Sequence, residues 1–355
     1  MSPLTIRDRL IGIDQPVYVI AELSANHNGS FEQAVELVRA AAASGADAVK
    51  LQTYRAGSMT IESDREWFTI EGTPWHGRTL FELYSEAQMP WEWQPELMQL
   101  ARELGLDVFS SVFDDASVAF LEELDCPAYK IASFELVDLP LITTVAGTGK
   151  PVILSTGMAT LDEIDEAVAT FREVGGHELA LLKCTSAYPA AAADMNLRTI
   201  PDLAARFGVE VGLSDHTLGS AVAVAAVSVG ATLIEKHLTL DRQQGGPDAG
   251  FSLEPPEFAQ LVTDIRTAYE SLGGVSYGPV GDETEMRAFR RSLFAVADIS
   301  AGDAFTASNV RAIRPGAGLH PRHLAEILGA TATSDISRGT PLEWSLVSGA
   351  RELAL

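Results

Sequence analysis

The sequence predicts an α/β fold in which a (β/α)8 TIM barrel is followed by a small β-rich domain. Short β-rich runs alternate eight times with amphipathic helical stretches, and alternating βα units in this number indicate a closed parallel barrel. After Gly278 the chain has short strands, many turns and little helix. We therefore place the barrel in residues 1–280 and the small domain in residues 281–355.

Each predicted strand is a short run rich in apolar and β-branched residues. In order, the runs are VYVIAEL, DAVKLQTY, DVFSSVF, AYKIASFE, PVILSTGM, ELALLKCTS, VEVGLSDHT and ATLIEKHLTL. The clearest predicted helices lie at residues 31–44, 91–104, 115–124 and 161–174. Glycines suited to helix ends follow at Gly45, Gly105, Gly175 and Gly208. A doubly wound sheet is the alternative, but its G-x-G-x-x-G motif after the first strand is missing here.

One connection is much longer than the others. Residues 55–90 interrupt the alternation after the second strand and are rich in aromatic side chains, among them Trp67, Trp75, Phe81 and Tyr84. Long loops in compact folds are usually functional or disordered, and this composition argues against disorder. We expect the insertion to cover the face of the barrel on which active sites form.

The charge balance excludes several classes of function. The chain has 25 Lys and Arg against 49 Asp and Glu, a formal net charge of -24 and an isoelectric point near 4.6. Such a field repels nucleic acid and anionic membranes. We see no secretion signal and no apolar segment of the roughly 20 residues that a spanning helix needs, so we expect a cytoplasmic protein. Cys126 and Cys184 are predicted to be small buried hydrophobes.

Polar residues recur at the carboxyl ends of the predicted strands, where barrel active sites form. Lys50 and Lys130 each lie inside an apolar strand, where an ammonium without a partner is costly and a bound anion would satisfy it. Together with serines near the same strand ends they predict a cradle for phosphate and carboxylate groups. These serines are Ser111, Ser133, Ser155 and Ser214.

His216 and His237 end consecutive strands, so they should be neighbours at the same height of the barrel. Two neutral imidazoles at matched positions, beside carboxylates, predict a divalent metal site, with Mn²⁺ first and Mg²⁺ or Co²⁺ as alternatives. Glu22 and Glu135 are strand-end carboxylates facing the same cavity. They are candidates for acid–base catalysis or for balancing the cations, and for Glu135 a hydrogen bond to a sugar hydroxyl is an equal alternative.

These residues lie in motifs that resemble those of the sialic acid synthase family. In order, the motifs are AELSANHNGS, ADAVKLQTY, YKIASFE, ILSTGM, LLKCTSAYP, VGLSDHT, IEKHLTLDR and GGPDAGFSL. The tail around VRAIRPGAGLHP resembles the antifreeze-protein-like (SAF) domain of that family. The insertion IEGTPWHGRTLFELYSEAQMPWEW and the segment KIASFE look most like the branch that makes pseudaminic acid. Branches that make neuraminate or legionaminate are the alternative.

The resemblance implies an enzyme that condenses phosphoenolpyruvate with an N-acylated amino-sugar and releases phosphate. The residues it assigns to phosphoenolpyruvate are Lys50, Ser111, Lys130, Ser133, Ser155, Ser186 and Ser214. Those it places at the sugar or the reacting atoms are Glu22, Gln52, Glu135, Tyr188 and Asp248. His216 and His237 would bind the metal, with His237 also acting in catalysis. Arg314 would reach the sugar of a neighbouring subunit, which implies a domain-swapped homodimer.

Two other classes of function stay open on the sequence. A metal-dependent sugar isomerase or epimerase would use the histidines and carboxylates but would need no anion cradle. A sugar-binding module would need neither the metal nor phosphate release.

Overall fold

The computed structural model describes residues 4–73 and 75–349. The chain divides into two compact units, Met1–Gly273 and Gly274–Leu355. The boundary predicted between residues 280 and 281 falls in an exposed segment, residues 273–291, that follows helix α10 (Pro255–Leu272). It stays a prediction, because an exposed segment has no packing that marks where one domain ends and the next begins.

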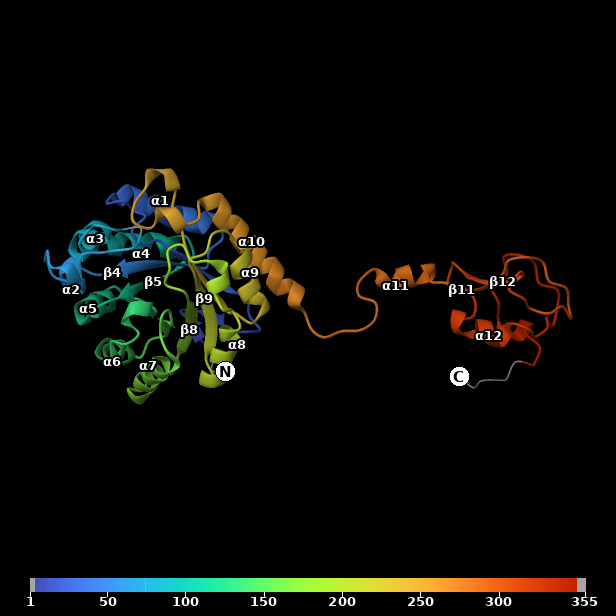
Figure 1. Ribbon diagram of the computed structural model, residues 1–355. Helices are drawn as coiled ribbons and strands as arrows, with labels where there is room; N and C mark the ends of the chain where they lie inside the picture. The colour runs from blue at the N-terminus through green and yellow to red at the C-terminus, as the bar shows by residue number, and fades with distance from the viewer. Residues whose placement is uncertain (1–3, 74, 350–355) are drawn as a thin grey trace. The chain divides into compact units, whose positions relative to one another are not determined.

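The first unit is built on a closed barrel of parallel strands, as the alternation of elements predicted (Figure 1). Each strand pairs with the next, and the last, β10, pairs with the first, β3. All eight predicted runs form the barrel strands. Their bounds are β3 Tyr18–Glu22, β4 Ala48–Thr53, β5 Asp107–Val112, β6 Tyr129–Ile131, β7 Val152–Ser155, β8 Leu179–Cys184, β9 Glu210–Asp215 and β10 Leu233–His237.

Helices between the strands surround the barrel in Figure 1. They are α1 Phe31–Ala43, α4 Gln94–Glu103, α5 Asp115–Glu123, α6 Leu139–Ala146, α7 Leu161–Glu173, α8 Thr199–Phe207, α9 Ala221–Ser228 and α10. Polar side chains cap four of them: Ser30, Asp114, Asp138 and Thr160 each accept a hydrogen bond from a backbone N–H in the first turn. The four glycines predicted at helix ends all have positive φ, the conformation that such ends require.

The bottom of the barrel, where the strands begin, is covered by an antiparallel hairpin, β1 (Leu4–Ile6) with β2 (Arg9–Ile11). Asp47, just before β4, accepts a hydrogen bond from the Val19 backbone and forms ion pairs with Arg9 and Arg266. These charges lie at the opposite end from the strand carboxyl termini, so they stabilise the barrel without taking part in a site at its mouth.

The second unit has its own core. An antiparallel pair, β11 (Ser292–Ala295) with β12 (Val310–Ile313), packs against apolar residues that include Phe305, Ile327 and Leu342. Its helices are short, α11 Glu283–Met286 and α12 Leu324–Ile327. This agrees with the predicted β-rich, helix-poor domain.

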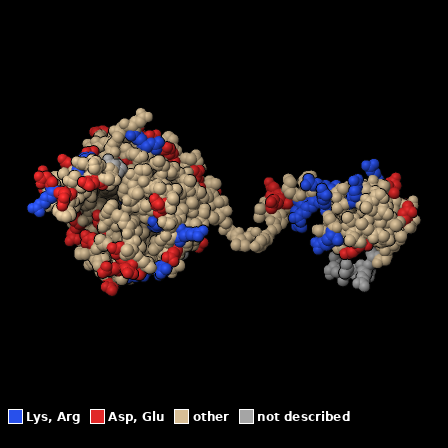
Figure 2. Space-filling view, viewed as in Figure 1, with Lys and Arg blue, Asp and Glu red and all other residues tan. Residues whose placement is uncertain are grey.

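The acidic excess belongs to the barrel. Residues 274–355 hold eight of the 25 Lys and Arg and nine of the 49 Asp and Glu, so this unit is nearly neutral. Figure 2 shows acidic side chains scattered over the barrel and a group of basic ones on the C-terminal unit. In the part of the chain that the structure describes, no helix is long and apolar enough to cross a membrane.

Gly212 on β9 lies where no side chain fits. A Cβ atom there would come within 2.3 Å of the Leu233 carbonyl oxygen and 2.8 Å of Leu182 Cδ2. We expect Gly212→Ala to destabilise the barrel by about 1–3 kcal/mol, because packed backbone must move. Thermal unfolding followed by circular dichroism measures this. Gly57→Ala, at a helical position with no atom within 4 Å, is the control; an equal loss there would contradict the steric explanation.

Candidate active site

The mouth of the barrel is lined by charged and hydroxyl side chains from neighbouring strands. Strand register places Glu22 beside Lys50, Gln52 beside Ser111, and Ser111 beside Lys130. Because side chains alternate along a strand, the polar residues two apart lie on the inner face. These predicted site residues are therefore brought together at one end of the barrel.

Lys50 is the centre of the cluster. Its Nζ lies 2.6 Å from Glu22 Oε2 and 3.7 Å from Glu235 Oε1, and it donates a hydrogen bond of 3.0 Å to Ser111 Oγ. Gln52 Nε2 donates to the other oxygen of Glu22 at 2.8 Å. The sequence predicts a bound anion as the group that satisfies Lys50; in the structure, register across β3 and β4 also puts a carboxylate directly beside it.

Burial and mutual attraction set the charges of this cluster. Burial opposes the charged form of Lys50, but Glu22 and Glu235 outweigh it and raise the pKa of its ammonium. Burial raises the pKa of Glu22 despite the opposing effect of Lys50. In Glu235 the two lysines, Lys50 and Lys130, outweigh burial and lower the pKa of its carboxyl. Of the two carboxyls, Glu235 is therefore the one that ionises more readily.

Lys130 differs from Lys50. It is fully buried, its Nζ donates to the Ile131 carbonyl at 2.9 Å, and no described carboxylate lies within 4 Å of it. Burial lowers the pKa of its ammonium to about 8. A bound anion, which the sequence predicts at this lysine, would supply the counter-charge that no described carboxylate provides.

The hydroxyl groups of Ser133 and Ser186 lie close to the Gly157 backbone, and Ser155 ends the preceding strand, β7; we call these four residues the serine cradle. Ser133 Oγ accepts a hydrogen bond from Gly157 N at 3.0 Å. A Cβ at Gly157 would lie 2.3 Å from Ser186 Oγ and 2.7 Å from Ser133 Oγ. The Ser155 hydroxyl, on the adjoining strand end, is buried without a hydrogen-bond partner in the described structure. An anion oxygen would satisfy such donors.

Ser214 lies apart from the serine cradle. Its hydroxyl donates to Glu235 Oε1 at 3.0 Å. It therefore orients the carboxylate that faces both lysines, and the structure gives it no direct link with the other predicted serines.

The two histidines are neighbours, as predicted. Their ring centroids are 5.3 Å apart. His216 Nδ1 lies 3.1 Å from the Thr185 carbonyl, so it carries the proton and leaves Nε2 available as a ligand. His237 Nδ1 contacts Ser24 Oγ at 3.2 Å. Burial and nearby positive groups hold the pKa of His237 well below its usual value, so its imidazole is neutral at pH 7.

These imidazoles fit a divalent ion only as a partial ligand set. Among residues 4–73 and 75–349, no three His, Cys, Asp or Glu side chains are grouped closely enough to hold a metal ion. The neutral His237 and the oriented His216 suit an ion that takes its other ligands from water and substrate oxygens.

Two residues of the site were not recognised in the sequence. Glu235, two residues before His237 on the same strand, contacts Lys50 and Ser214. Cys184 is buried as predicted, but it is no inert hydrophobe: its Sγ lies 3.9 Å from His216 Nδ1. Burial disfavours the thiolate, but the contact with His216 outweighs it and lowers the pKa of the thiol to about 7.

The predicted sugar-facing residues lie around the rim. Glu135, in the turn Ser133–Glu135, has one buried carboxyl oxygen without a partner in the described structure, and burial raises its pKa to about 7. The Tyr188 ring lies 4.4 Å from that of His216. Asp248 Oδ2 accepts a hydrogen bond of 3.4 Å from Ala25 N, and burial raises the pKa of its carboxyl.

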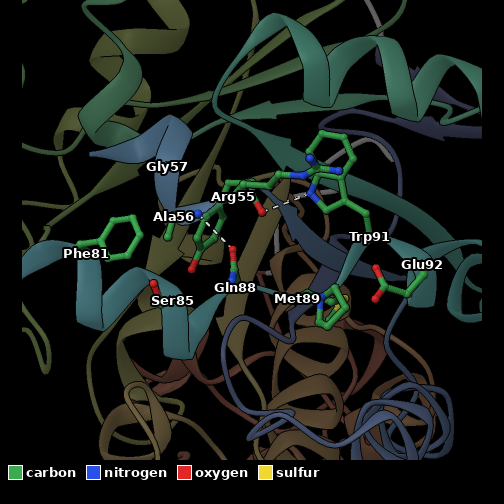
Figure 3. Close-up of a pocket in the computed structure, with 11 residues that line it drawn as sticks. Arg55, Ala56, Gly57, Phe81, Ser85, Gln88, Met89, Trp91 and Glu92 are labelled. Atoms are coloured by element: carbon green, nitrogen blue, oxygen red, sulfur yellow. Dashed lines mark hydrogen bonds between the residues drawn. The ribbon is translucent and has the colours of Figure 1, made fainter. Parts of the chain in front are cut away.

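The long insertion contains α2 (Ala56–Met59) and α3 (Leu80–Ala87) and reaches the same rim. Trp75 lies 5.8 Å from Tyr188, and its indole N–H donates to the Pro247 carbonyl. Between the insertion and the start of α4 is a cavity of about 440 Å³ (Figure 3). Arg55 lies over the Trp91 indole there. No predicted site residue lines this cavity, so it is separate from the polar cluster.

Arg314 belongs to the second unit, where it is exposed at the end of β12. The same unit has a pocket of about 650 Å³ lined by Arg287, Arg290, Arg291 and His320. The structure describes this unit by itself, so the predicted reach of Arg314 into a neighbouring subunit stays a prediction.

Comparison with known proteins gives the family of the chain. Residues 37–277 match the NeuB family, and residues 290–348 match the SAF domain. The chain belongs to the NeuB family. This confirms the resemblance to sialic acid synthases that the motifs indicated.

Relatives match over nearly the whole chain. Pseudaminic acid synthase of Helicobacter pylori is 45% identical over 92% of this chain and 97% of its own, and that of Campylobacter jejuni strain 81-176 is 44% identical over 94% and 97%. N,N'-diacetyllegionaminic acid synthase of Legionella pneumophila is 37% identical over 94% and 95%. A solved N-acetylneuraminic acid synthetase from Leptospira borgpetersenii, in complex with citrate, is 31% identical, with a TM-score of 0.72 over 81% of this chain and 95% of that one.

The serine cradle gives a direct test of anion binding. Gly157→Ala places a methyl group against the hydroxyls of Ser133 and Ser186, so we expect the affinity for inorganic phosphate to fall at least about tenfold, the equivalent of about 1.4 kcal/mol. Calorimetric titration measures it. Gly250→Ala, with no atom within 4 Å of the new Cβ, is the control. Equal affinity in the Gly157→Ala protein would place the anion elsewhere.

Proposed function

We propose that this protein is a pseudaminic acid synthase. It would condense phosphoenolpyruvate with 2,4-diacetamido-2,4,6-trideoxy-L-altrose and water to give pseudaminic acid and phosphate. The observation that carries the proposal is the pair of buried lysines beside the serine cradle and two imidazoles, in a chain whose overall charge is strongly negative. The choice of sugar follows the relatives named pseudaminic acid synthase, which are more similar to this chain than the legionaminic relative.

Phosphoenolpyruvate would bind at the two lysines and the serine cradle. Lys130, which has no described carboxylate partner, would pair with the phosphate or carboxylate, and the orphan Ser155 hydroxyl would donate to it. Ser133 and Ser186 would add donors from the neighbouring loops. Lys50 is already neutralised by Glu22 and Glu235, so it would attract the anion less strongly than Lys130. Its ammonium donates a hydrogen bond to Ser111, whose hydroxyl would in turn donate to the anion.

The amino-sugar would lie between the histidines and the rim. Tyr188, beside His216, offers an apolar face for a sugar ring. Glu135, Asp248 and Gln52 would hydrogen-bond its hydroxyl and acetamido groups. The buried oxygen of Glu135 without a described partner makes it the strongest of these contacts.

His216 and His237 would hold a divalent ion, Mn²⁺ first and Mg²⁺ or Co²⁺ as alternatives. When bound, such an ion supplies Lewis-acid polarisation of the aldehyde oxygen. The protein's part is to aim both imidazoles: the Thr185 carbonyl orients His216, and burial keeps His237 uncharged. Burial opposes the charged form of His216, but Cys184 and the Thr185 carbonyl outweigh it and raise the pKa of this imidazole, so a bound ion would displace a proton there.

The bond changes define what the carboxylates must do. C3 of phosphoenolpyruvate bonds to the aldehyde carbon, whose oxygen takes up a proton, and positive character develops at C2. Water adds at C2 and gives up a proton, and the C2–O bond to phosphate then breaks. Glu22, held by Lys50 and Gln52, would orient that water or stabilise the charge at C2. Glu135, with its pKa near 7, would be available for proton transfer.

We further propose that the active form is a domain-swapped homodimer in which Arg314 of one chain reaches the sugar of the other. The barrel carries the acidic excess and the basic side chains of the second unit gather on one surface (Figure 2), a distribution that favours association of the two. Together with the insertion, the second unit would exclude bulk water from the reacting atoms.

Phosphate release decides the substrate. We expect turnover of phosphoenolpyruvate with the trideoxy-diacetamido-altrose, because the relatives named for that product are more similar to this chain than the legionaminic relative. Chelation should abolish release and added Mn²⁺ should restore it. A phosphate-release assay with each sugar measures this. Turnover with N-acetylmannosamine but not with the altrose would contradict the assignment, and turnover of the corresponding legionaminate precursor alone would favour that branch.

Binding of phosphoenolpyruvate should weaken as the pH rises through about 8. In the folded protein the Lys130 pKa is about 8, below its ordinary 10.5, so its ammonium is present below that pH and lost above it. Lys50 stays charged because Glu22 and Glu235 raise its pKa. We expect the affinity to fall by up to about tenfold per pH unit, the limit for one linked proton.

Calorimetric titration between pH 7 and 9.5 checks this. Lys130→Met should bind phosphoenolpyruvate weakly and without that pH dependence. Cys184 and Glu135, whose pKa values are about 7, are unchanged in this variant, so they would still titrate if they were the cause. A variant with the wild-type slope would assign the titration to another group.

A further inference from the structure

A second buried ion pair lies directly behind the histidines. Lys236 Nζ is 2.8 Å from Asp215 Oδ2, and both side chains are fully buried. Lys236 Nζ also donates to the Thr217 carbonyl, while Thr217 donates its backbone N–H and its hydroxyl to Asp215 Oδ1 at 2.9 and 2.7 Å. We call Asp215, Thr217 and Lys236 the rear staple. Each of its members is next in sequence to a histidine.

The rear staple and the site use opposite faces of the same two strands. Register pairs Ser214 with Glu235 and Asp215 with Lys236. Ser214 and Glu235 bond to each other inside the barrel, so the alternation of side chains sends Asp215 and Lys236 outward. The next positions inward are His216 and His237. A slip of one residue would exchange the two faces, and the two polar pairs together forbid it.

Stability alone does not require charges at these positions. Among the outward residues next to site residues on other strands, Ala21, Ile131 and Leu154 are buried and apolar, and Thr53 and Ser110 are buried and polar but uncharged. A buried ion pair is often no more stable than well-packed apolar residues of similar volume, because both charges must be desolvated. The rear staple instead sets the position of one strand end relative to the other, because its bonds hold the backbone at residues 215–217 against that at residue 236.

We propose that Asp215, Thr217 and Lys236 are positioning residues that set the distance and orientation of the His216 and His237 imidazoles. They touch no substrate, and their effect reaches the site only through the backbone of the histidines. The inference rests on the proposed function, in which those imidazoles bind a divalent ion.

The test is Mn²⁺ binding to the metal-free protein, measured by calorimetry and without turnover. The double variant Asp215→Asn/Lys236→Met removes both charges and keeps an acceptor for Thr217. We expect its Mn²⁺ affinity to fall about 10–100-fold, the usual effect of losing a group that orients metal ligands. Thr217→Val keeps the ion pair and removes one donor, so it should fold normally and lose several-fold.

Arg266→Met is the matched control, since it breaks an ion pair with Asp47 at the other end of the barrel. It should lower the melting temperature and leave Mn²⁺ affinity unchanged. Phosphoenolpyruvate affinity, measured without metal, should stay within twofold in all three proteins, which a general loosening of the barrel would not allow.

Wild-type Mn²⁺ affinity in the double variant or in Thr217→Val overturns the inference, and so does an equal loss in Arg266→Met. Failure of the proposed function is distinguishable. In that case the wild-type protein binds Mn²⁺, His237→Gln abolishes this binding, and no sugar gives phosphate release.

Discussion

The site depends on keeping positive charge buried at the mouth of a barrel whose surface is strongly acidic. Two lysines are buried in apolar strands, where a charged group loses its hydration. The protein compensates this cost differently for each of them. Lys50 is neutralised internally by Glu22 and Glu235. Lys130 is left without a carboxylate within 4 Å among the described residues, so its charge is available to a ligand. The first lysine organises the protein, and the second attracts the anion.

This division explains how one cavity can serve two unlike substrates. The serine cradle and Lys130 lie at the ends of β6, β7 and β8, whereas the histidines end β9 and β10. Glu22, on β3, closes the ring beside β10 through the pairing of Glu22 with His237. An anion and a polarised aldehyde would thus approach each other across the barrel axis, with a carboxylate beside the atoms that change bonding.

Much of this could be predicted from the sequence, because it depends on local periodicity. Alternation along each strand identifies which polar residues share a face, and eight βα units imply a closed barrel. From this alternation the sequence predicts that the two histidines are neighbours at the barrel mouth, and the structure has them there.

What that reasoning missed depends on register between strands. The contact of Lys50 with Glu22, and of Glu235 with Lys50, exists only once β3 lies between β4 and β10. Cys184 was read as a hydrophobe because nothing in its own strand reveals the His216 ring on the next one. The position of the second unit relative to the barrel is likewise outside local pattern.

Closure of the barrel between β10 and β3 has a consequence for the nascent chain on the ribosome. Glu22 is translated more than two hundred residues before His237, its neighbour in the β10–β3 pairing, and before Glu235, which contacts the same lysine, Lys50. Until then β3 has a free edge and the catalytic groups on it are incomplete. The residues of the site therefore come together only when β10 pairs with β3 and the barrel closes.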